Sequence, residues 1–236
     1  MRNRYSRHTQ KALESFDEIE NDRFFGVHKR GTDLEEIFTR ITRKSREIDA
    51  TYPGTQVGRY WVQPLRDRES GSIPPQRVIN ALNLDQRRKE GKRILRVPEP
   101  VGLAYEGTLK GYLGERSKGY FVTGFVKGRK LLSALREETD EKVKQKISSK
   151  ILLEVRILYD ETKLVLLDFA PRDIVLVGND QIPVFCDTEH LKTRTDYNGE
   201  TKKVMVDMER QFRKDYELFL RPETINRLAE AYFKER

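Results

Sequence analysis

The most constraining feature of this sequence is a run of short apolar segments between residues 164 and 187, with aspartates at their ends. The last two segments are joined by Gly178-Asn179-Asp180-Gln181, a pattern typical of a β-hairpin. A turn of this length brings Asp173, which begins the hairpin, and Asp187, which ends it, to the same open end. Asp168 follows the first segment and lies just before that end. We therefore expect three carboxylates to gather at one end of a hairpin.

Three neighbouring carboxylates repel one another unless a cation or a basic side chain lies among them. Carboxylate oxygens suit a hard divalent cation, and Mg²⁺ is the simplest choice. The alternative is that Asp168 and Asp187 are ordinary residues at strand ends. Spacing alone leaves both interpretations open.

The pattern of apolar residues changes from strand-forming to helix-forming near residues 126–128. Before that point we expect helices over 8–21, 34–41 and 75–96, a hairpin of 47–52 with 57–62, and strands over 101–105 and 119–126. After it we expect helices over 139–159, 204–220 and 223–234, with the second half of the first of these the most buried helix. The sequence thus predicts an α+β fold in two lobes, with an N-terminal helical extension (1–44), an N-lobe (45–126) and a C-lobe (127–236).

Composition excludes several classes of protein. The sequence holds no run of 18 apolar residues, so we expect no membrane span. The basic N-terminal segment is not followed by an apolar stretch, which argues against a secretory signal and favours a cytoplasmic location. Cys186 is the single cysteine, so an intramolecular disulfide is excluded, and three histidines make a histidine-only metal site improbable.

The net charge of +8 raises the alternative of a nucleic-acid-binding protein. Basic and acidic residues alternate within segments such as 85–93, however, and aromatic residues are missing there. This pattern favours a solvated helix face over a stripe that binds phosphates. Nucleic acid is therefore an unlikely partner, although the charge still suits a smaller anionic partner such as a nucleotide.

Two stretches around the aspartates resemble motifs of the protein-kinase-like phosphotransferases. Residues 166–176 are similar to the catalytic loop H-R-D-L-x-P-x-N-I-L, with the same spacing of five between its two acidic or polar positions. Residues 184–189 resemble the D-F-G motif, in the D-F-E form found in small-molecule kinases. The resemblance implies that Asp168 is the catalytic base and that Asp173 and Asp187 hold Mg²⁺ against the phosphates of ATP.

The resemblance extends to residues that would bind the nucleotide. Residues 120–128 are similar to the fifth strand and hinge of these kinases, which implies that Gly124 and the Val126 backbone take the adenine and that Thr123 is the gatekeeper. The alternative is a plain core strand. Glu90 resembles the helix glutamate that pairs with a strand lysine in the family, with a solvated helix residue as the alternative.

This sequence departs from the family pattern at several positions. Gln63 stands where the phosphate-binding lysine belongs, and Arg66 is the nearest basic residue that could replace it. No G-x-G-x-x-G loop precedes this strand, and Leu166 replaces the histidine of the catalytic loop. These departures favour a pseudokinase, which binds nucleotide with little turnover, whereas the intact aspartates favour an active phosphotransferase.

Short strings are similar to the lipopolysaccharide core heptose kinases, a subfamily of comparable size: Arg23-Phe24-Phe25-Gly26, Glu36-Ile37-Phe38 and Gly58-Arg59-Tyr60. Few residues follow Glu189, which predicts a protein-kinase-like fold with a reduced C-terminal lobe. The acceptor expected from this resemblance is the hydroxyl group of a small molecule or a glycolipid, and the expected cofactors are ATP and Mg²⁺.

Overall fold

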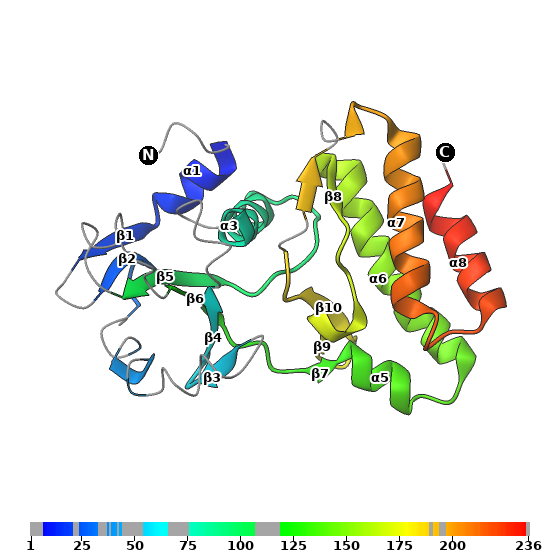
Figure 1. Ribbon diagram of the computed structural model, residues 1–236, viewed down its shortest axis with the longest axis horizontal. Coiled ribbons are helices and arrows are strands. Elements are labelled where there is room, and N and C mark those ends of the chain that lie inside the picture. The colour runs from blue at the N-terminus through cyan, green and yellow to red at the C-terminus, as the bar shows by residue number, and fades with distance from the viewer. Residues whose placement is uncertain are drawn as a thin grey trace. The chain divides into compact units, whose positions relative to one another are not determined.

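The computed structural model contains two compact units, shown in Figure 1. It describes residues 7–20, 24–32, 37, 39–41, 43, 54–65, 76–106, 119–188, 191–193 and 197–234. Unit 1 comprises residues 1–86 and 98–125, and unit 2 comprises residues 87–97 and 126–236. Helices and sheets are mixed along the chain, so the α+β class is confirmed.

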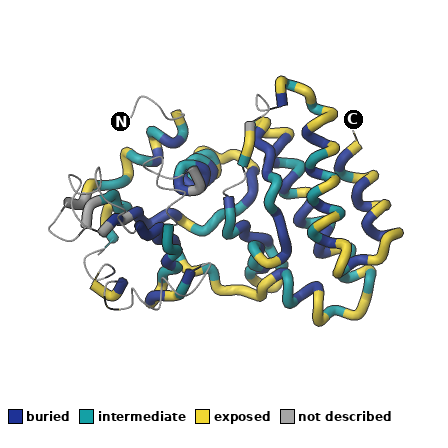
Figure 2. Tube along the Cα trace, in the orientation of Figure 1, coloured by how far each residue is buried: buried dark blue, intermediate teal, exposed yellow. Residues whose placement is uncertain are grey.

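Unit 1 is built on a six-stranded antiparallel sheet with the strand order β1-β2-β5-β6-β4-β3. Its strands are β1 (Phe16–Glu20), β2 (Phe24–Lys29), β3 (Thr55–Val57), β4 (Tyr60–Leu65), β5 (Pro100–Glu106) and β6 (Gly119–Gly124). Unit 1 also contains the helix α1 (Arg7–Leu13) and most of the helix α3 (Gln76–Lys89). The last turn of α3, residues 87–89, belongs to unit 2. The central strand β6 is buried along nearly its whole length, as Figure 2 shows.

Each face of this sheet has its own apolar layer, because successive side chains of a strand point to opposite faces. Val62 and Val122 contribute to one layer, together with Ile41. Phe121 contributes to the other layer, where it meets Leu82 of α3. The face that α3 covers is therefore the face to which Phe121 points.

The prediction of a helix over 8–21 is wrong for the second half of that range. The chain leaves α1 at Leu13 and forms β1, which pairs along its whole length with β2. The apolar stripe of this segment was weak, and the strand is stabilised by pairing with a segment further along the chain, which local periodicity does not report. The other strands predicted here, over 101–105 and 119–126, are present as β5 and β6.

Two further boundaries differ from the prediction. The hairpin turn lies at Gly58-Arg59, between β3 and β4, and residues 47–52 lie outside the described residues. The helix predicted over 75–96 ends at Lys89, because Gly91 takes a left-handed φ of 84° and closes the helix. Of the helix predicted over 34–41, residues 37 and 39–41 are described and helical.

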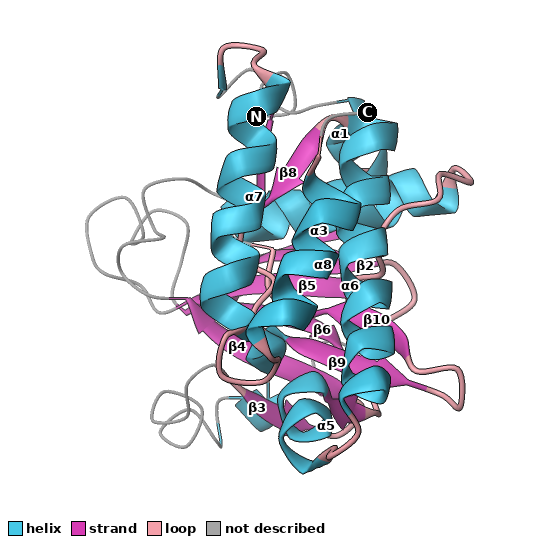
Figure 3. Cartoon of the chain, turned by 90° about the vertical axis from the view of Figure 1, so that its right-hand side faces the viewer, coloured by secondary structure: helices cyan, strands magenta, loops and turns pink. Residues whose placement is uncertain are grey.

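Unit 2 is mainly helical. Its elements are β7 (Arg129–Lys130), α5 (Leu131–Glu137), α6 (Glu141–Thr162), β8 (Leu164–Leu166), the 3₁₀ helix η3 (Pro171–Asp173), β9 (Ile174–Val177), β10 (Ile182–Phe185), β11 (Leu191–Thr193), α7 (Thr201–Tyr216) and α8 (Pro222–Phe233). Helix α8 packs against both α6 and α7 (Figure 3). The predicted apolar stripe of α6 is buried, although Leu153 in its second half is 41% exposed.

No helix among the described residues is both long enough and apolar enough to cross a membrane.

Arg156 of α6 contacts both other long helices of unit 2, and its Nη1 donates to the Met205 Sδ of α7 at 3.5 Å. Its Nε donates to the Asp160 carboxylate at 2.9 Å, and its Nη1 donates to the Tyr232 carbonyl at 3.0 Å, near the end of α8.

Hydrogen bonds from a charged donor contribute about 1.5–3 kcal/mol. We expect Arg156→Ala to lower the free energy of unfolding, measured in urea, by about that amount. Arg210→Ala, which removes an exposed ion pair of α7, should cost less than about 1 kcal/mol. Equal losses in the two variants would contradict this role.

Candidate functional site

Asp168 is held in place by buried neighbours on both sides. Strand β8 is buried throughout, and Phe169 directly after Asp168 is fully buried. The Phe169 ring lies 6.5 Å from that of Tyr216, and the Tyr216 hydroxyl donates to the Phe169 carbonyl at 3.4 Å. Pro171 is buried as well. The half-buried Asp168 therefore sits in a segment that the core of unit 2 fixes at each end.

The register of the hairpin places Asp173 and Asp187 at its open end. Strands β9 and β10 are antiparallel, and Ile174 opposite Phe185 is their last pair. Beyond that pair, the Cys186 amide donates to the Asp173 carbonyl at 2.8 Å. Asp187 follows directly, so the placement predicted from the turn length agrees with the register.

A tight turn brings Asp173 back toward the segment that contains Asp168. The Asp173 amide donates to the Ala170 carbonyl at 3.0 Å, which closes the 3₁₀ helix η3. Proline at the first position of η3 has the backbone angle that such a turn needs. The spacing of five between the two aspartates is thus produced by one extended stretch and one helical turn.

Negative charge accumulates at this end of the hairpin. The pKa of Asp173 is raised to about 6, mainly because the carboxyl group is buried. The charge of Arg172, 3.1 Å away, lowers this pKa, whereas the charges of Asp187 and Asp168 raise it. Burial also raises the pKa of Asp215 on α7, and the charge of Asp168 adds to that shift. A cation added at this place would therefore be stabilised.

The donor set fits Mg²⁺ that arrives with phosphate groups. Among the described residues, no group of three or more histidine, cysteine, aspartate or glutamate side chains is arranged to hold a metal ion by itself. Mg²⁺ in phosphate-transfer sites is usually held by one or two carboxylates, and phosphate oxygens and water complete its octahedral shell. Asp173 and Asp187 supply hard oxygen ligands and an excess of negative charge, which suits that mode of binding. A dedicated three-carboxylate cage is not supported.

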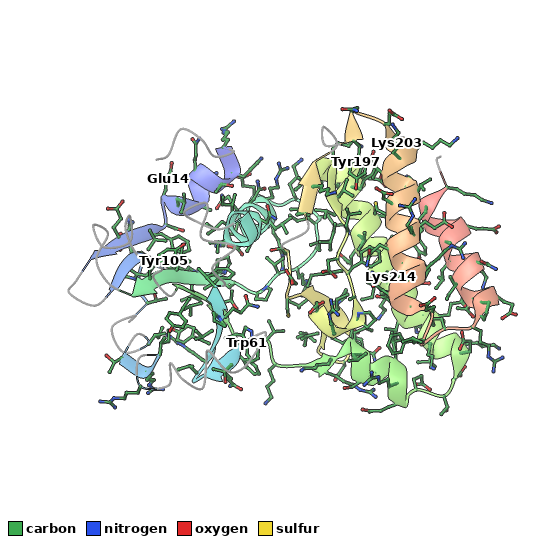
Figure 4. All side chains as sticks on the ribbon, in the orientation of Figure 1. Glu14, Trp61, Tyr105, Tyr197, Lys203 and Lys214 are labelled. Atoms are coloured by element: carbon green, nitrogen blue, oxygen red, sulfur yellow. The ribbon has the colours of Figure 1, made fainter. Side chains whose placement is uncertain are left out.

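Gln63 and Thr123, two of the residues predicted to bind nucleotide, share one face of the sheet of unit 1. Gln63 of β4 lies opposite Phe121 of β6, and Thr123 lies opposite Trp61. These four residues face the side of the sheet that α3 covers, as the burial of Phe121 against α3 indicates. Thr123 is buried and Gln63 is half-buried. Figure 4 labels Trp61 in this unit.

The other residues predicted to bind nucleotide lie at element ends. The Gly124 amide at the end of β6 donates to the Glu99 carbonyl at 2.8 Å, and Val126 is the first residue of the second part of unit 2. Glu90 lies in the exposed turn after α3, not on the helix as expected, because α3 ends at Lys89. Arg66 lies outside the described residues. The roles of Gln63, Glu90, Thr123, Gly124 and Val126 toward a nucleotide stay predictions.

Comparison with known proteins gives similarity at the level of structure. No protein-family model matches the sequence, and no curated protein sequence matches it. One similar solved structure is that of a divergent kinase lacking the glycine-rich loop, which regulates membrane ultrastructure of the Toxoplasma parasitophorous vacuole. It has a TM-score of 0.42 and 11% identity, and the match covers 97% of this chain and 84% of that one.

Two other similar structures are of the kinase Rad53. The kinase domain with SCD2 bound to AMPPNP has a TM-score of 0.39 and 13% identity, over 94% of this chain and 75% of that chain. Residues 1–466 of Rad53 bound to AMP-PNP have a TM-score of 0.36 and 15% identity, over 93% of this chain and 52% of that chain. In this chain itself, an antiparallel sheet with a helix precedes a helical unit whose hairpin bears the aspartates.

Sequence reasoning missed two charged residues of this site. Arg172 stands beside Asp173 in the sequence, and its basic character next to an expected metal ligand was the available signal. Asp215 lies 28 positions beyond Asp187 and reaches the site only because α7 packs near β8. No motif in the sequence around Asp215 predicts that it belongs to this site.

Proposed function

We propose that this chain is an ATP- and Mg²⁺-dependent phosphotransferase of the protein-kinase-like type. The observation that carries the proposal is the grouping of Asp168, Asp173 and Asp187 around the open end of one hairpin. The raised pKa of Asp173 supports it, because burial and the neighbouring carboxylates disfavour the charged form of this side chain, and a bound cation would stabilise that form. The three kinase structures are consistent with this proposal.

Each aspartate would have a distinct role. ATP supplies the phosphoryl group, and Mg²⁺ balances phosphate charge when both are bound. Asp173 and Asp187 would hold the cation, because both lie at the hairpin end. Asp168 would orient the acceptor hydroxyl and accept its proton, since its segment is anchored by Phe169 and Pro171. Catalysis of this type depends on positioning and charge rather than on covalent chemistry by the protein.

The acceptor proposed for this reaction is the hydroxyl group of a small molecule or a glycolipid. The support is the short connection between Asp187 and the start of α7 at Thr201, part of which is held against β8 as strand β11. The narrower resemblance to lipopolysaccharide core heptose kinases and a cytoplasmic location stay predictions. Adenine contacts by Thr123, Gly124 and Val126 are part of the same proposal.

The alternative function is that of a pseudokinase, which binds nucleotide or a partner with little turnover. Two residues favour it: Gln63 is uncharged where the family has lysine, and Leu166 is buried in β8 where the family has histidine. We therefore expect slow turnover, and ADP formation under single-turnover conditions is the direct test. Formation of ADP that stops when EDTA removes Mg²⁺ would favour the phosphotransferase. Nucleotide binding without any ADP formation would favour the pseudokinase.

Gln63→Lys tests whether the neutral side chain of β4 limits nucleotide binding. A lysine would add a charge-assisted bond to phosphate, which is roughly twice as strong as a neutral one. We expect Gln63→Lys to tighten ATP binding about tenfold in calorimetric titrations. The matched control is Gln56→Lys on β3, which adds the same charge to an exposed position of the same sheet. Equal affinity gains in both variants would show a general charge effect and contradict a specific role for position 63.

A further inference from the structure

Arg172 presents an accessible cation beside the proposed catalytic base. It lies in η3, and its side chain is 70% exposed, whereas that of its partner Asp173 is 18% exposed. The Arg172 Nε donates to the Asp173 carboxylate at 3.1 Å. In the part of the chain that the structure describes, the guanidinium makes no other hydrogen bond. Its two Nη groups, with four N–H donors, are therefore available to a ligand.

The charge of Arg172 acts on more than its bonded partner. Asp168 and Asp215 both interact electrostatically with the guanidinium, in addition to Asp173. An anionic molecule that approached Asp168 would be repelled by these carboxylates, and the charge of Arg172 offsets part of that repulsion. A cation bound by Asp173 would also compete with Arg172 for that carboxylate, which would leave the guanidinium more free to bind elsewhere.

The chemistry of the guanidinium specifies the kind of group that it would bind. Its planar arrangement of donors matches the oxygens of a phosphate or a carboxylate and can bind them in pairs. A neutral sugar hydroxyl would gain less from such a partner, because charge-assisted hydrogen bonds are the stronger ones. Arg172 lies in the sequence between the residues proposed for base and metal and interacts electrostatically with both, so an anion that it binds would lie near the proposed base.

We propose that Arg172 binds an anionic group of the acceptor, so that the acceptor is an alcohol that also carries a phosphate or a carboxylate. This inference rests on the proposed function, because it requires nucleotide and metal at the neighbouring aspartates. Arg172 has no part in breaking or making bonds. It is a binding residue that selects the acceptor by charge.

The test uses simple probes on the full chain loaded with Mg²⁺ and AMP-PNP. Inorganic phosphate and glycerol 3-phosphate should each raise the melting temperature further, and glycerol, which lacks the anionic group, should not. Arg172→Gln should weaken the binding of both anions at least tenfold, with an intermediate loss for Arg172→Lys. The matched control is Arg210→Gln, because Arg210 is 75% exposed and also pairs with one carboxylate. It should bind both anions as the wild type does.

The outcomes separate this inference from the proposed function. If Mg²⁺ and AMP-PNP leave the melting temperature of the wild type unchanged, the proposed function fails, and this inference fails with it. If the nucleotide binds but both anions have no effect, or bind Arg172→Gln as tightly as the wild type, only the acceptor assignment is overturned. It is also overturned if Arg172→Gln weakens AMP-PNP binding as much as it weakens anion binding.

Discussion

Replacing Asp168 with asparagine is expected to reduce phosphoryl transfer by about 10²–10⁴-fold, the usual contribution of a general base. Asparagine keeps the size and polarity of the side chain but cannot accept the proton of the acceptor hydroxyl. Because Asp168 is assigned to the acceptor and not to the metal, affinity for Mg²⁺ and ATP should stay within about threefold of the wild type. ADP formation and calorimetric titration with AMP-PNP measure the two quantities separately.

The control for this prediction is Asp180→Asn. Asp180 lies in the turn at the other end of the same hairpin and is exposed. Its carbonyl accepts a bond from Lys150 at 2.6 Å, which the substitution leaves in place. This variant should retain wild-type transfer and affinity. A parallel loss of transfer and nucleotide affinity in Asp168→Asn would contradict the division of roles among the aspartates.

Asp187→Ala is expected to remove most of the stabilisation that Mg²⁺ adds to ATP binding. A ligand at 100 times its Kd stabilises a protein by about 2.7 kcal/mol. The alanine removes one of the two carboxylates proposed to hold the cation, so most of the Mg²⁺-dependent part should disappear from thermal unfolding curves. The Mg²⁺-independent part should change little.

Asp180→Ala is the matched control for this second substitution, because it removes a carboxylate from the same hairpin at the end away from the site. It should keep the full Mg²⁺-dependent shift. Circular dichroism of both variants without ligand checks that the hairpin remains folded. A full Mg²⁺-dependent shift in Asp187→Ala would show that the metal lies elsewhere.

The elements that were predicted best are those that depend on residues close together in the sequence. The turn Gly178-Asn179-Asp180-Gln181 between two apolar segments was enough to place Asp173 and Asp187 at one end. The apolar stripe of α6 was enough to identify a long buried helix. In both cases the residues that determine the structure lie within one turn or one helix face, so a single sequence reports them.

The features that were missed depend on contacts distant in sequence. Strand β1 pairs with β2, and nothing within residues 16–20 distinguishes this strand from the end of a polar helix. Helix α3 ends early because of one glycine, Gly91, which removes Glu90 from the helix. Asp215 joins the site through α7, and its effect there depends on burial, which the sequence around it does not encode.

The most direct test of the central claim is a thermal-shift titration of the wild-type chain with ATP, with Mg²⁺ and with EDTA. The grouping of Asp173 and Asp187 predicts a rise in melting temperature that grows with ATP concentration and depends on Mg²⁺. Mg²⁺ alone should have a much smaller effect, because the two carboxylates need phosphate oxygens to complete the metal shell. A melting temperature that ATP leaves unchanged in the presence of Mg²⁺ would contradict the assignment of this hairpin end as a nucleotide site.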